Sequence, residues 1–409
     1  PGFFILTSMI LVTIFTSCLF SSLLLVLIYK ISRYFTKNEK HRMLLVIIAG
    51  LCSPIFPTAL SMFMHQVGTF FIFLSFYLLF KIKQEKLEDN KYFVFAGLSL
   101  GFSIASDFYS FFIVPILVFY IFLLTMFKNK QKFFIFLFGC LVGLSPFLFY
   151  NFSILGFHLE LLSKYNDRSI YTTVSEATFN NYGFVTPRIE VLYQILIGSY
   201  RGLFFYYPIL LLSLIGVFYM YKKFKMESGI ILLIFIFNVI VVSSRVTWHG
   251  GYGFGLKYLL LSTPFLIIPL LFEFKDFESL PIKTIITILI LISLITNLSG
   301  LQLLEDFIID RKTLMIADMY QKDVSNLNLL NPLQNYYFPL LLKYGPRSLI
   351  FENLFEKHVD IDIRDIPLSR DWKPPYNGGT NHIPFLSFIL ILIIMGLLWS
   401  SELYESIKR

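Results

Sequence analysis

Long apolar stretches alternate with short polar turns along almost the whole chain. A helix needs about 20 mostly apolar residues to cross the hydrocarbon core of a bilayer, and these stretches approach or reach that length. The pattern predicts eleven membrane spans, near residues 3–29, 43–62, 66–81, 92–106, 110–127, 133–150, 203–221, 228–244, 258–272, 284–299 and 384–400. The predicted fold class is therefore an all-α polytopic membrane protein.

Composition supports the membrane assignment. Hydrophobic residues make up 56% of the 409 positions and charged residues only 15%, which is more apolar surface than a soluble domain of this size can bury. The three cysteines, Cys18, Cys52 and Cys140, lie far apart in apolar stretches. They have no ligand spacing, and neither they nor the scattered histidines form a metal-binding motif.

The net charge of +8 comes largely from basic residues in every second turn. The turns YKISRYFTKNEKHR, KIKQEKLEDNK, KNKQK and YKKFK are rich in Lys and Arg, whereas FMHQ and SDFYS contain neither. Short cytoplasmic loops carry such an excess, which predicts that Pro1 lies outside and Arg409 in the cytoplasm. We expect the bilayer, not nucleic acid, to be the partner of this charge. Abundant Phe, Ile and Lys suggest a prokaryotic plasma membrane.

This orientation predicts three regions. Residues 1–299 form a transmembrane domain with an extracytoplasmic loop at 151–202, residues 300–383 form an extracytoplasmic segment, and residues 384–409 form the last helix and a cytoplasmic tail. In the loop, PRIEVLYQILIGSY (187–200) has apolar residues at helical spacing and predicts an amphipathic helix on the membrane surface. The segment 300–383 is either a small folded cap or a loosely structured loop.

The stretch SSRVTWHGGYGFGLKYLLLSTPF (243–265) interrupts the apolar pattern at the outer face. Its glycines let the backbone turn tightly and approach a ligand. Its tryptophan is suited to stacking on a sugar or to anchoring at the headgroups. The candidate binding residues in it are Arg245, Trp248, His249, Lys257 and Tyr258. The alternative is a flexible turn flanked by ordinary interfacial side chains.

Further polar residues lie at the predicted outer ends of spans. They are His65, Asp107, Glu160, Arg188, Glu190 and Arg201. Acids, bases and cations that converge on one membrane face suggest a site for a charged, membrane-embedded substrate such as a polyprenyl phosphate. Each also has a structural alternative: Arg201 can snorkel to the interface, Asp107 can cap the following helix, and His65 can be a packing residue.

Four stretches together resemble polytopic glycosyltransferases of the GT-C superfamily, which includes protein O-mannosyltransferases and lipid A aminoarabinose transferases. They are GLCSPIFPTALSMFMH (50–65), FYNFSILGFHLELLSKY (149–165), GFVTPRIEVLYQILIGSYRGLFFYYPILLL (183–212) and WHGGYGFGLKYLLLSTPFL (248–266). In relatives the last stretch reads Trp, paired Gly, then Gly-x-Arg-Tyr-Leu. Here Lys257 takes the place of that Arg, which keeps the charge but loses the bidentate fork.

The resemblance implies a sugar donor linked to a polyprenyl phosphate, an acceptor on the extracytoplasmic side and no cofactor. The acceptor is a protein, a lipid or a glycan. The catalytic carboxylate of such enzymes lies in a loop before the second span, so we expect it upstream of Pro1, with Asp107 as a further candidate. Arg201, Lys257, Arg245 and His65 would bind the donor phosphate. Trp248, His249, Tyr258, Glu160 and Glu190 would contact the sugar or the acceptor.

Two other function classes remain open from the sequence. A transporter or flippase of an amphipathic anion predicts ionisable residues in the middle of spans, and the predicted spans are nearly free of them. The other class is a membrane scaffold of glycan assembly that catalyses no reaction. An upstream loop without acidic residues would favour it.

Overall fold

The computed structural model describes residues 8, 11–61, 63–126, 129–155, 184–245, 248–250, 254–273, 280–300, 331–338 and 341–342. Helices dominate this part of the chain, and it contains no strand. The only extended pairing within it is an isolated antiparallel bridge between Phe184 and Arg245. The described part of the protein is therefore all-α in character.

The first five helical segments pack against one another. A short π-helical turn, η1 (Ile14–Cys18), leads into α2 (Leu19–Ser32), and α3 (Glu39–Leu51), α4 (Ile55–Ala59) and α5 (His65–Glu85) follow. Asn38 begins α3 because its side chain accepts hydrogen bonds from the amides of Lys40 and His41. The predicted span 43–62 is broken between α3 and α4, at Pro54, which cannot continue the hydrogen-bond ladder of a helix.

Helices α6 (Asn90–Ser106) and α8 (Lys130–Leu155) lie unusually close together, with α7 (Ser110–Thr125) between them in the chain. A Cβ added at Gly97 or Gly101 would lie 2.0 Å from a backbone oxygen of α8, and one at Gly139 or Gly143 would lie 2.2 to 2.4 Å from a backbone oxygen of α6. The four glycines form two GxxxG pairs, the spacing that lets membrane helices touch backbone to backbone.

The C-terminal half is more broken. It contains α10 (Ile189–Leu196), α11 (Leu203–Tyr206), η4 (Pro208–Leu210), α12 (Leu211–Tyr221), α13 (Lys225–Ser243), η5 (Lys257–Ser262), α14 (Thr263–Ile267), α15 (Leu270–Glu273), α16 (Leu280–Ser299) and η8 (Leu333–Tyr337). Pro208 and Pro264 lie where the predicted spans 203–221 and 258–272 divide into shorter helices. The amphipathic helix is present as α10, shorter than 187–200, and it buries Val191 and Ile195 while exposing Ile189 and Tyr193.

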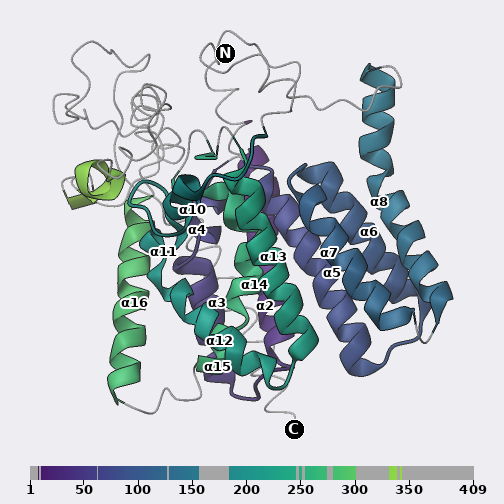
Figure 1. Ribbon diagram of the computed structural model, residues 1–409, viewed down its shortest axis with the longest axis horizontal. Coiled ribbons are helices and arrows are strands. Elements are labelled where there is room, and N and C mark those ends of the chain that lie inside the picture. The colour runs from purple at the N-terminus through teal and green to yellow at the C-terminus, as the bar shows by residue number, and fades with distance from the viewer. Residues whose placement is uncertain are drawn as a thin grey trace.

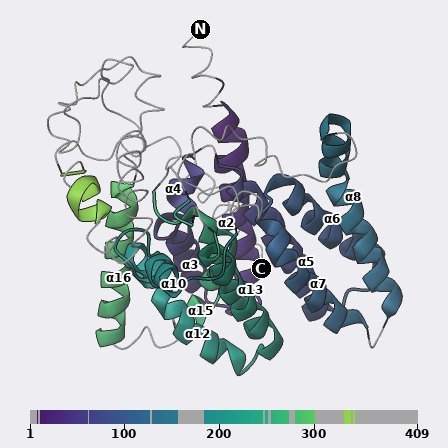
Figure 2. The same ribbon diagram turned by 45° about the horizontal axis from the view of Figure 1, so that its top comes forward.

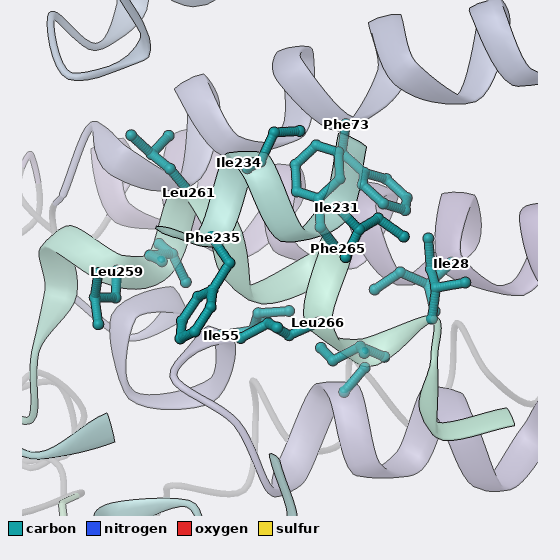
Figure 3. Packing of buried hydrophobic residues seen from close by; sticks show 14 of the residues in the cluster. Ile28, Ile55, Phe73, Ile231, Ile234, Phe235, Leu259, Leu261, Phe265 and Leu266 are labelled. Carbon is teal, nitrogen blue, oxygen red and sulfur yellow. The ribbon is translucent and has the colours of Figure 1, made fainter. Parts of the chain in front are cut away.

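The hydrophobic core lies where α5, α13 and α14 meet (Figure 3). The rings of Phe73 and Phe265 pack edge to face at 5.4 Å between centroids. Ile231, Ile234 and Leu266 are fully buried around them. Helix α14 therefore occupies the interior, and α8 and α16 lie at opposite edges of the molecule in both Figure 1 and Figure 2.

Every predicted span up to residue 299 contains helix, but among the residues that the structure describes only four helices are both long and apolar enough to cross a membrane by length and composition. These are Leu11–Ser32, His65–Glu85, Lys130–Ile154 and Lys225–Ser243. Shorter apolar helices occupy Ser110–Thr125, Pro208–Tyr221, Lys257–Ile267 and Lys283–Ser299. The structure thus has the character of a multi-pass membrane protein, while the count of eleven spans stays a prediction. The span 384–400 and most of the segment 300–383 lie outside the described residues.

The basic turns meet at one end of the bundle, here called the basic end (residues 33–42, 81–91, 129–132 and 222–227). Lys83 of α5 pairs with Glu227 of α13 at 2.5 Å. Lys132 of α8 donates to Asn90 of α6 at 2.6 Å, and Tyr34 donates to Glu85. The starts of α5 and α7 and the end of α6 lie at the opposite end, and His65 and Asp107 lie there with them.

Candidate active site

His65 and Asp107 lie in direct contact at the end opposite the basic end. His65 is the first residue of α5, and Asp107 follows the last residue of α6. The His65 Nδ1 atom lies 2.8 Å from Oδ2 of Asp107, and the two side chains are 15% and 4% exposed. The other carboxylate oxygen, Oδ1, accepts the backbone N–H of Tyr109 at 3.1 Å. Asp107 thus closes a turn before α7 and does not cap that helix with its side chain.

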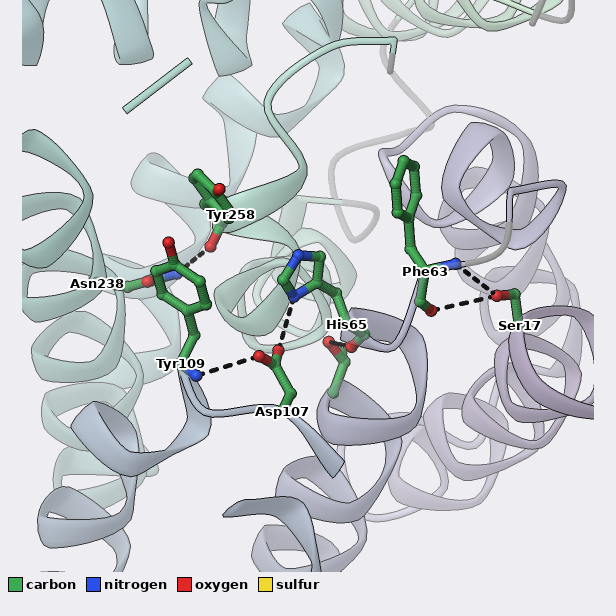
Figure 4. A network of polar contacts seen from close by, with 8 residues as sticks. Ser17, Phe63, His65, Asp107, Tyr109, Asn238 and Tyr258 are labelled. Carbon is green, nitrogen blue, oxygen red and sulfur yellow. Dashed lines mark hydrogen bonds and ion pairs between the residues drawn. The ribbon is translucent and has the colours of Figure 1, made fainter. Parts of the chain in front are cut away.

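Two tyrosines pack beside this pair (Figure 4). The rings of Tyr109 and Tyr258 stack with centroids 4.5 Å apart, and the imidazole of His65 meets both rings edge-on at 5.7 and 5.5 Å. Asn238 of α13 donates to the backbone oxygen of Tyr258 at 3.3 Å, which fixes the start of η5. The predicted site residues His65, Asp107 and Tyr258 therefore come from three distant parts of the chain and meet.

Lys257 reaches over the same region from η5. Its ammonium lies 4.0 Å from the centre of the Phe63 ring, within the range of a cation–π contact. Phe63 is itself held by Ser17, whose hydroxyl is 3.2 Å from both the backbone N and the backbone O of Phe63. The cation thereby lies over a ring that is two positions before His65 in the chain.

Arg201 is buried beneath the glycine-rich stretch. Its guanidinium is 3% exposed, donates to the backbone oxygen of Gly255 at 2.8 Å and lies over the ring of Tyr200. Gly250 and Gly255 have positive φ angles of 83° and 65°, a conformation that favours glycine. Gly250 and Gly255 therefore shape the loop beside Arg201, and their approach to a ligand stays a prediction.

His249 lies among the cations. Desolvation, and after it the positive charges of Arg201, Lys257 and Arg188, together lower its pKa from 6.5 to about 3. The three cations thus act on one imidazole, which is neutral at physiological pH. A concentration of positive charge at the end of a span, beside a neutral hydrogen-bonding ring, is suited to an anion such as a phosphate.

Arg245 and Arg188 extend the cationic surface. The Arg245 guanidinium lies over the rings of Phe184 and Tyr109, at 4.9 and 5.5 Å, and Arg188 donates to the backbone oxygen of Arg245 at 3.2 Å. Burial lowers the pKa of Arg188, and the negative charge of Glu190 raises it. Glu190 is exposed in the first turn of α10. Arg245 thus stands next to Tyr109 and joins the His65 region to the loop.

Trp248 is only 4% exposed. Its ring packs edge-to-face against Tyr200 and His249, each with centroids 5.9 Å away. Glu160 lies outside the described residues. Among the described residues no group of three or more His, Cys, Asp or Glu side chains is arranged to hold a metal ion.

Sequence reasoning did not nominate Tyr109 or Phe63 for the site, and it named Arg188 among the outer-face polar residues without giving it a role. Tyr109 and Phe63 stand in the same outer turns as Asp107 and His65, so their position in SDFYS and MFMH was the available signal. Arg188 was visible as an outer-face cation, but only the fold brings it to within electrostatic reach of His249.

Comparison with known proteins adds one finding. Residues 2–150 match the family model described as dolichyl-phosphate-mannose-protein mannosyltransferase. The match covers a little over a third of the chain, includes His65 and Asp107 and ends before Arg201 and Lys257. It indicates a membrane glycosyltransferase of the mannosyltransferase type. Neither a curated protein nor a solved structure matches the chain.

Proposed function

We propose that this protein is a membrane glycosyltransferase that moves a sugar from a polyprenyl-phosphate donor to an acceptor on the extracytoplasmic side. The main support is the convergence of Arg201, Lys257 and Arg188 on His249. Such a donor keeps its tail in the bilayer and its phosphate at headgroup depth, where cations at the end of a span can reach it. The family match over residues 2–150 supports the same chemistry.

In the proposed reaction the acceptor attacks the anomeric carbon and the polyprenyl phosphate leaves. Arg201 and Lys257 stabilise the departing phosphate, whose negative charge increases as the bond breaks. Arg245 is a further phosphate ligand, and Tyr258, Trp248, His249, Glu160 and Glu190 are proposed to contact the sugar or the acceptor. We expect the reaction to need no cofactor, because these cationic side chains can supply the positive charge that a metal ion would otherwise supply to the phosphate.

The distribution of buried charge favours a transferase over a transporter. In the described part of the chain the buried charged residues are Asp107, Arg201 and Glu227. Asp107 follows α6, Arg201 precedes α11, and Glu227 is the third residue of α13. All three lie at helix ends, whereas a translocation path needs ionisable groups along the middle of the spans.

The test is a transfer assay on the full-length natural protein in membranes supplied with radiolabelled polyprenyl-phosphate hexoses. Arg201→Ala and Lys257→Ala are expected to lower kcat/KM by at least about 100-fold, the typical cost of removing one transition-state contact. Lys257→Arg should retain most activity because it keeps the charge. Lys222→Ala removes an exposed cation at the basic end and is the matched control. Folded Arg201 and Lys257 variants with wild-type activity would overturn the donor site.

A further inference from the structure

We propose that the isoprenoid chain of the donor lies on four phenylalanines at the start of α7, here called the phenylalanine cluster (Phe108, Phe111, Phe112 and Phe184), with the donor phosphate at the neighbouring Arg245. This inference rests on the proposed transferase function and deepens it, because it names the surface that recognises the lipid part of the donor. The observation that carries it is a continuous series of ring contacts that leads from an exposed aromatic surface to a cation of the candidate site.

The rings of the phenylalanine cluster touch one another in order. Phe108 and Phe111 lie parallel with their centroids 6.0 Å apart, and Phe112 meets both rings edge-on at 5.9 and 5.8 Å. Phe112 also packs against Phe184, with the centroids 5.3 Å apart. The cluster therefore joins the start of α7 to the segment that forms the antiparallel bridge with Arg245.

The cluster ends at a cation. The Arg245 guanidinium lies over the ring of Phe184, 4.9 Å from its centre. The backbone holds this contact in place, because the Val185 amide donates to the backbone oxygen of Ser244 at 2.7 Å. Helix α13, which ends just before Arg245, packs against α7. A polyprenyl phosphate has the same order of groups, since its anion is joined directly to an apolar chain.

The cluster is partly exposed and lacks the composition of an interfacial anchor. Phe111 is 52% exposed, and Phe108, Phe112 and Phe184 are partly buried. The aromatic belts of membrane proteins consist of Trp and Tyr, whose polar atoms reach the headgroups. Phenylalanine has no such atom, so four phenylalanine rings beside a cation suit an apolar chain better than a headgroup.

Helix α7 extends this surface away from the cation. Phe111, Pro115, Phe119 and Leu123 are exposed at every fourth position, a spacing that places side chains one above the other on a helix. The stripe runs from the end that carries the candidate site toward the basic end. In the predicted orientation it therefore leads a chain that starts at Arg245 from headgroup depth into the hydrocarbon core.

The first experiment measures binding by the full-length natural protein in nanodiscs and does not depend on turnover. The probe is a polyprenyl phosphate with a photoreactive diazirine on the isoprene unit next to the phosphate. We expect its label in peptides that contain residues 108–112 or Phe184. Excess unlabelled polyprenyl phosphate should abolish the labelling, and phosphatidylglycerol should not.

Two labelling results overturn the inference. A label found only in other peptides would place the chain elsewhere on the protein. Labelling that phosphatidylglycerol abolishes equally well would show that the cluster is a surface for ordinary anionic lipids.

The second experiment compares two donors in detergent, one with a full-length isoprenoid chain and one with a single isoprene unit. Phe111 lies two rings beyond Phe184, farther from Arg245 than a single unit reaches. We expect Phe111→Ala and Phe119→Ala each to raise the KM for the long donor by about 10-fold, the cost of losing one buried aromatic contact. The KM for the short donor and kcat for both donors should stay unchanged. Arg245→Gln should raise the KM for both donors, because both carry the phosphate.

Phe149→Ala is the matched control. Phe149 is 76% exposed near the outer end of α8, a helix at the edge of the molecule (Figure 1). Its replacement removes an exposed phenylalanine at similar depth and should leave the KM for both donors unchanged.

The kinetic outcomes separate this inference from the proposed function. If Phe111→Ala and Phe119→Ala raise the KM for both donors equally, or if Phe149→Ala has the same effect as they do, the chain does not lie on α7 although the protein is a transferase. If the wild-type protein transfers sugar from neither donor, the proposed function fails and the inference about its donor fails with it. The labelling then shows whether the cluster binds the lipid without transfer.

Discussion

His249 is the side chain whose surroundings have the most direct consequence for stability against pH. Its pKa is lowered to about 3 in the folded protein, first because the partly buried ring loses hydration and then because Arg201, Lys257 and Arg188 repel a proton. The unfolded chain has a pKa near 6.5 at this residue, so between these values the unfolded state binds a proton that the folded state does not. Stability is therefore fully present above about pH 6.5 and falls as the pH falls toward about 3.

We predict that unfolding in detergent, followed between pH 7 and pH 5, shows a loss of stability of at most about 1.4 kcal/mol per pH unit from this group. His249→Gln removes the titrating group, so its stability should depend less on pH over that interval. His41→Gln changes a histidine outside the site, so the stability of this variant should depend on pH as that of the wild type does. An unchanged slope in His249→Gln would contradict the prediction.

The positions of the site residues were predictable from the sequence, but their contacts and burial were not. The candidate residues His65, Asp107 and Tyr258 were visible as polar positions at predicted span ends, and the structure brings them together. Their pairing could not be predicted, because Asp107 and His65 are 42 positions apart and two helices separate them. The burial of Trp248 could not be predicted from the sequence either, because an interfacial tryptophan and a core tryptophan have the same sequence pattern.

The positions of helices were predictable and their continuity was less so. Apolar runs located α5, α6, α7, α8, α13 and α16, because each run reads as uninterrupted hydrophobic sequence. The runs at 43–62, 203–221 and 258–272 divide into shorter helices at prolines, whereas Pro115 of α7 and Pro146 of α8 lie inside continuous helices. Hydropathy averages over such breaks, whereas the backbone hydrogen bonds do not.

The contact between α6 and α8 gives a prediction for two elements. A Cβ at Gly101 would lie 2.0 Å from the backbone oxygen of Cys140, so Gly101→Leu must push the helices apart and lose their packing. We expect the free energy of unfolding to fall by about 1 to 3 kcal/mol, which thermal unfolding in detergent would measure. Gly229→Ala is the matched control, because a Cβ there meets nothing within 4 Å. Equal stability of the two variants would contradict the close contact.

An ion pair at the basic end joins three helices. Glu227 of α13 is fully buried and accepts from Lys83 of α5 at 2.5 Å and from Tyr120 of α7 at 2.8 Å. Lys83→Met would leave the carboxylate buried without its cation. We expect a cost of about 3 kcal/mol, near the lower limit for a buried pair since Lys83 is 33% exposed.

The double variant Lys83→Met with Glu227→Gln removes both charges and should recover most of that loss. Thermal unfolding of the wild type, the two single variants and the double variant forms a double-mutant cycle. If Lys83→Met alone is as stable as the wild type, the pair does not hold these helices together.

At the scale of the whole molecule, the fold places two groups of charged residues at opposite ends of the helix bundle. Basic turns gather at one end, where they meet Glu85 and Glu227, and the candidate site with His65, Asp107 and Lys257 lies at the other. The sequence predicted this separation from the alternation of basic and neutral turns. The same rule predicts which side of the membrane each end faces, and the side determines where transfer occurs.

That orientation is testable with one residue at each end. Met64 is 56% exposed beside His65, and Lys40 is exposed at the basic end. In a background with Cys18, Cys52 and Cys140 replaced, a membrane-impermeant maleimide added to intact cells should label Met64→Cys. It should label Lys40→Cys only after the membrane is permeabilised. Both variants should label equally in detergent, which controls for burial.

The reverse pattern would place the site in the cytoplasm and contradict transfer on the extracytoplasmic side. The cation cluster around His249 would still suit a polyprenyl phosphate, because either leaflet presents the phosphate at headgroup depth. The basic turns would then face outward against the usual bias. Since the bias is counted over short loops close to the spans, and these turns are short, we expect the labelling to follow the predicted orientation.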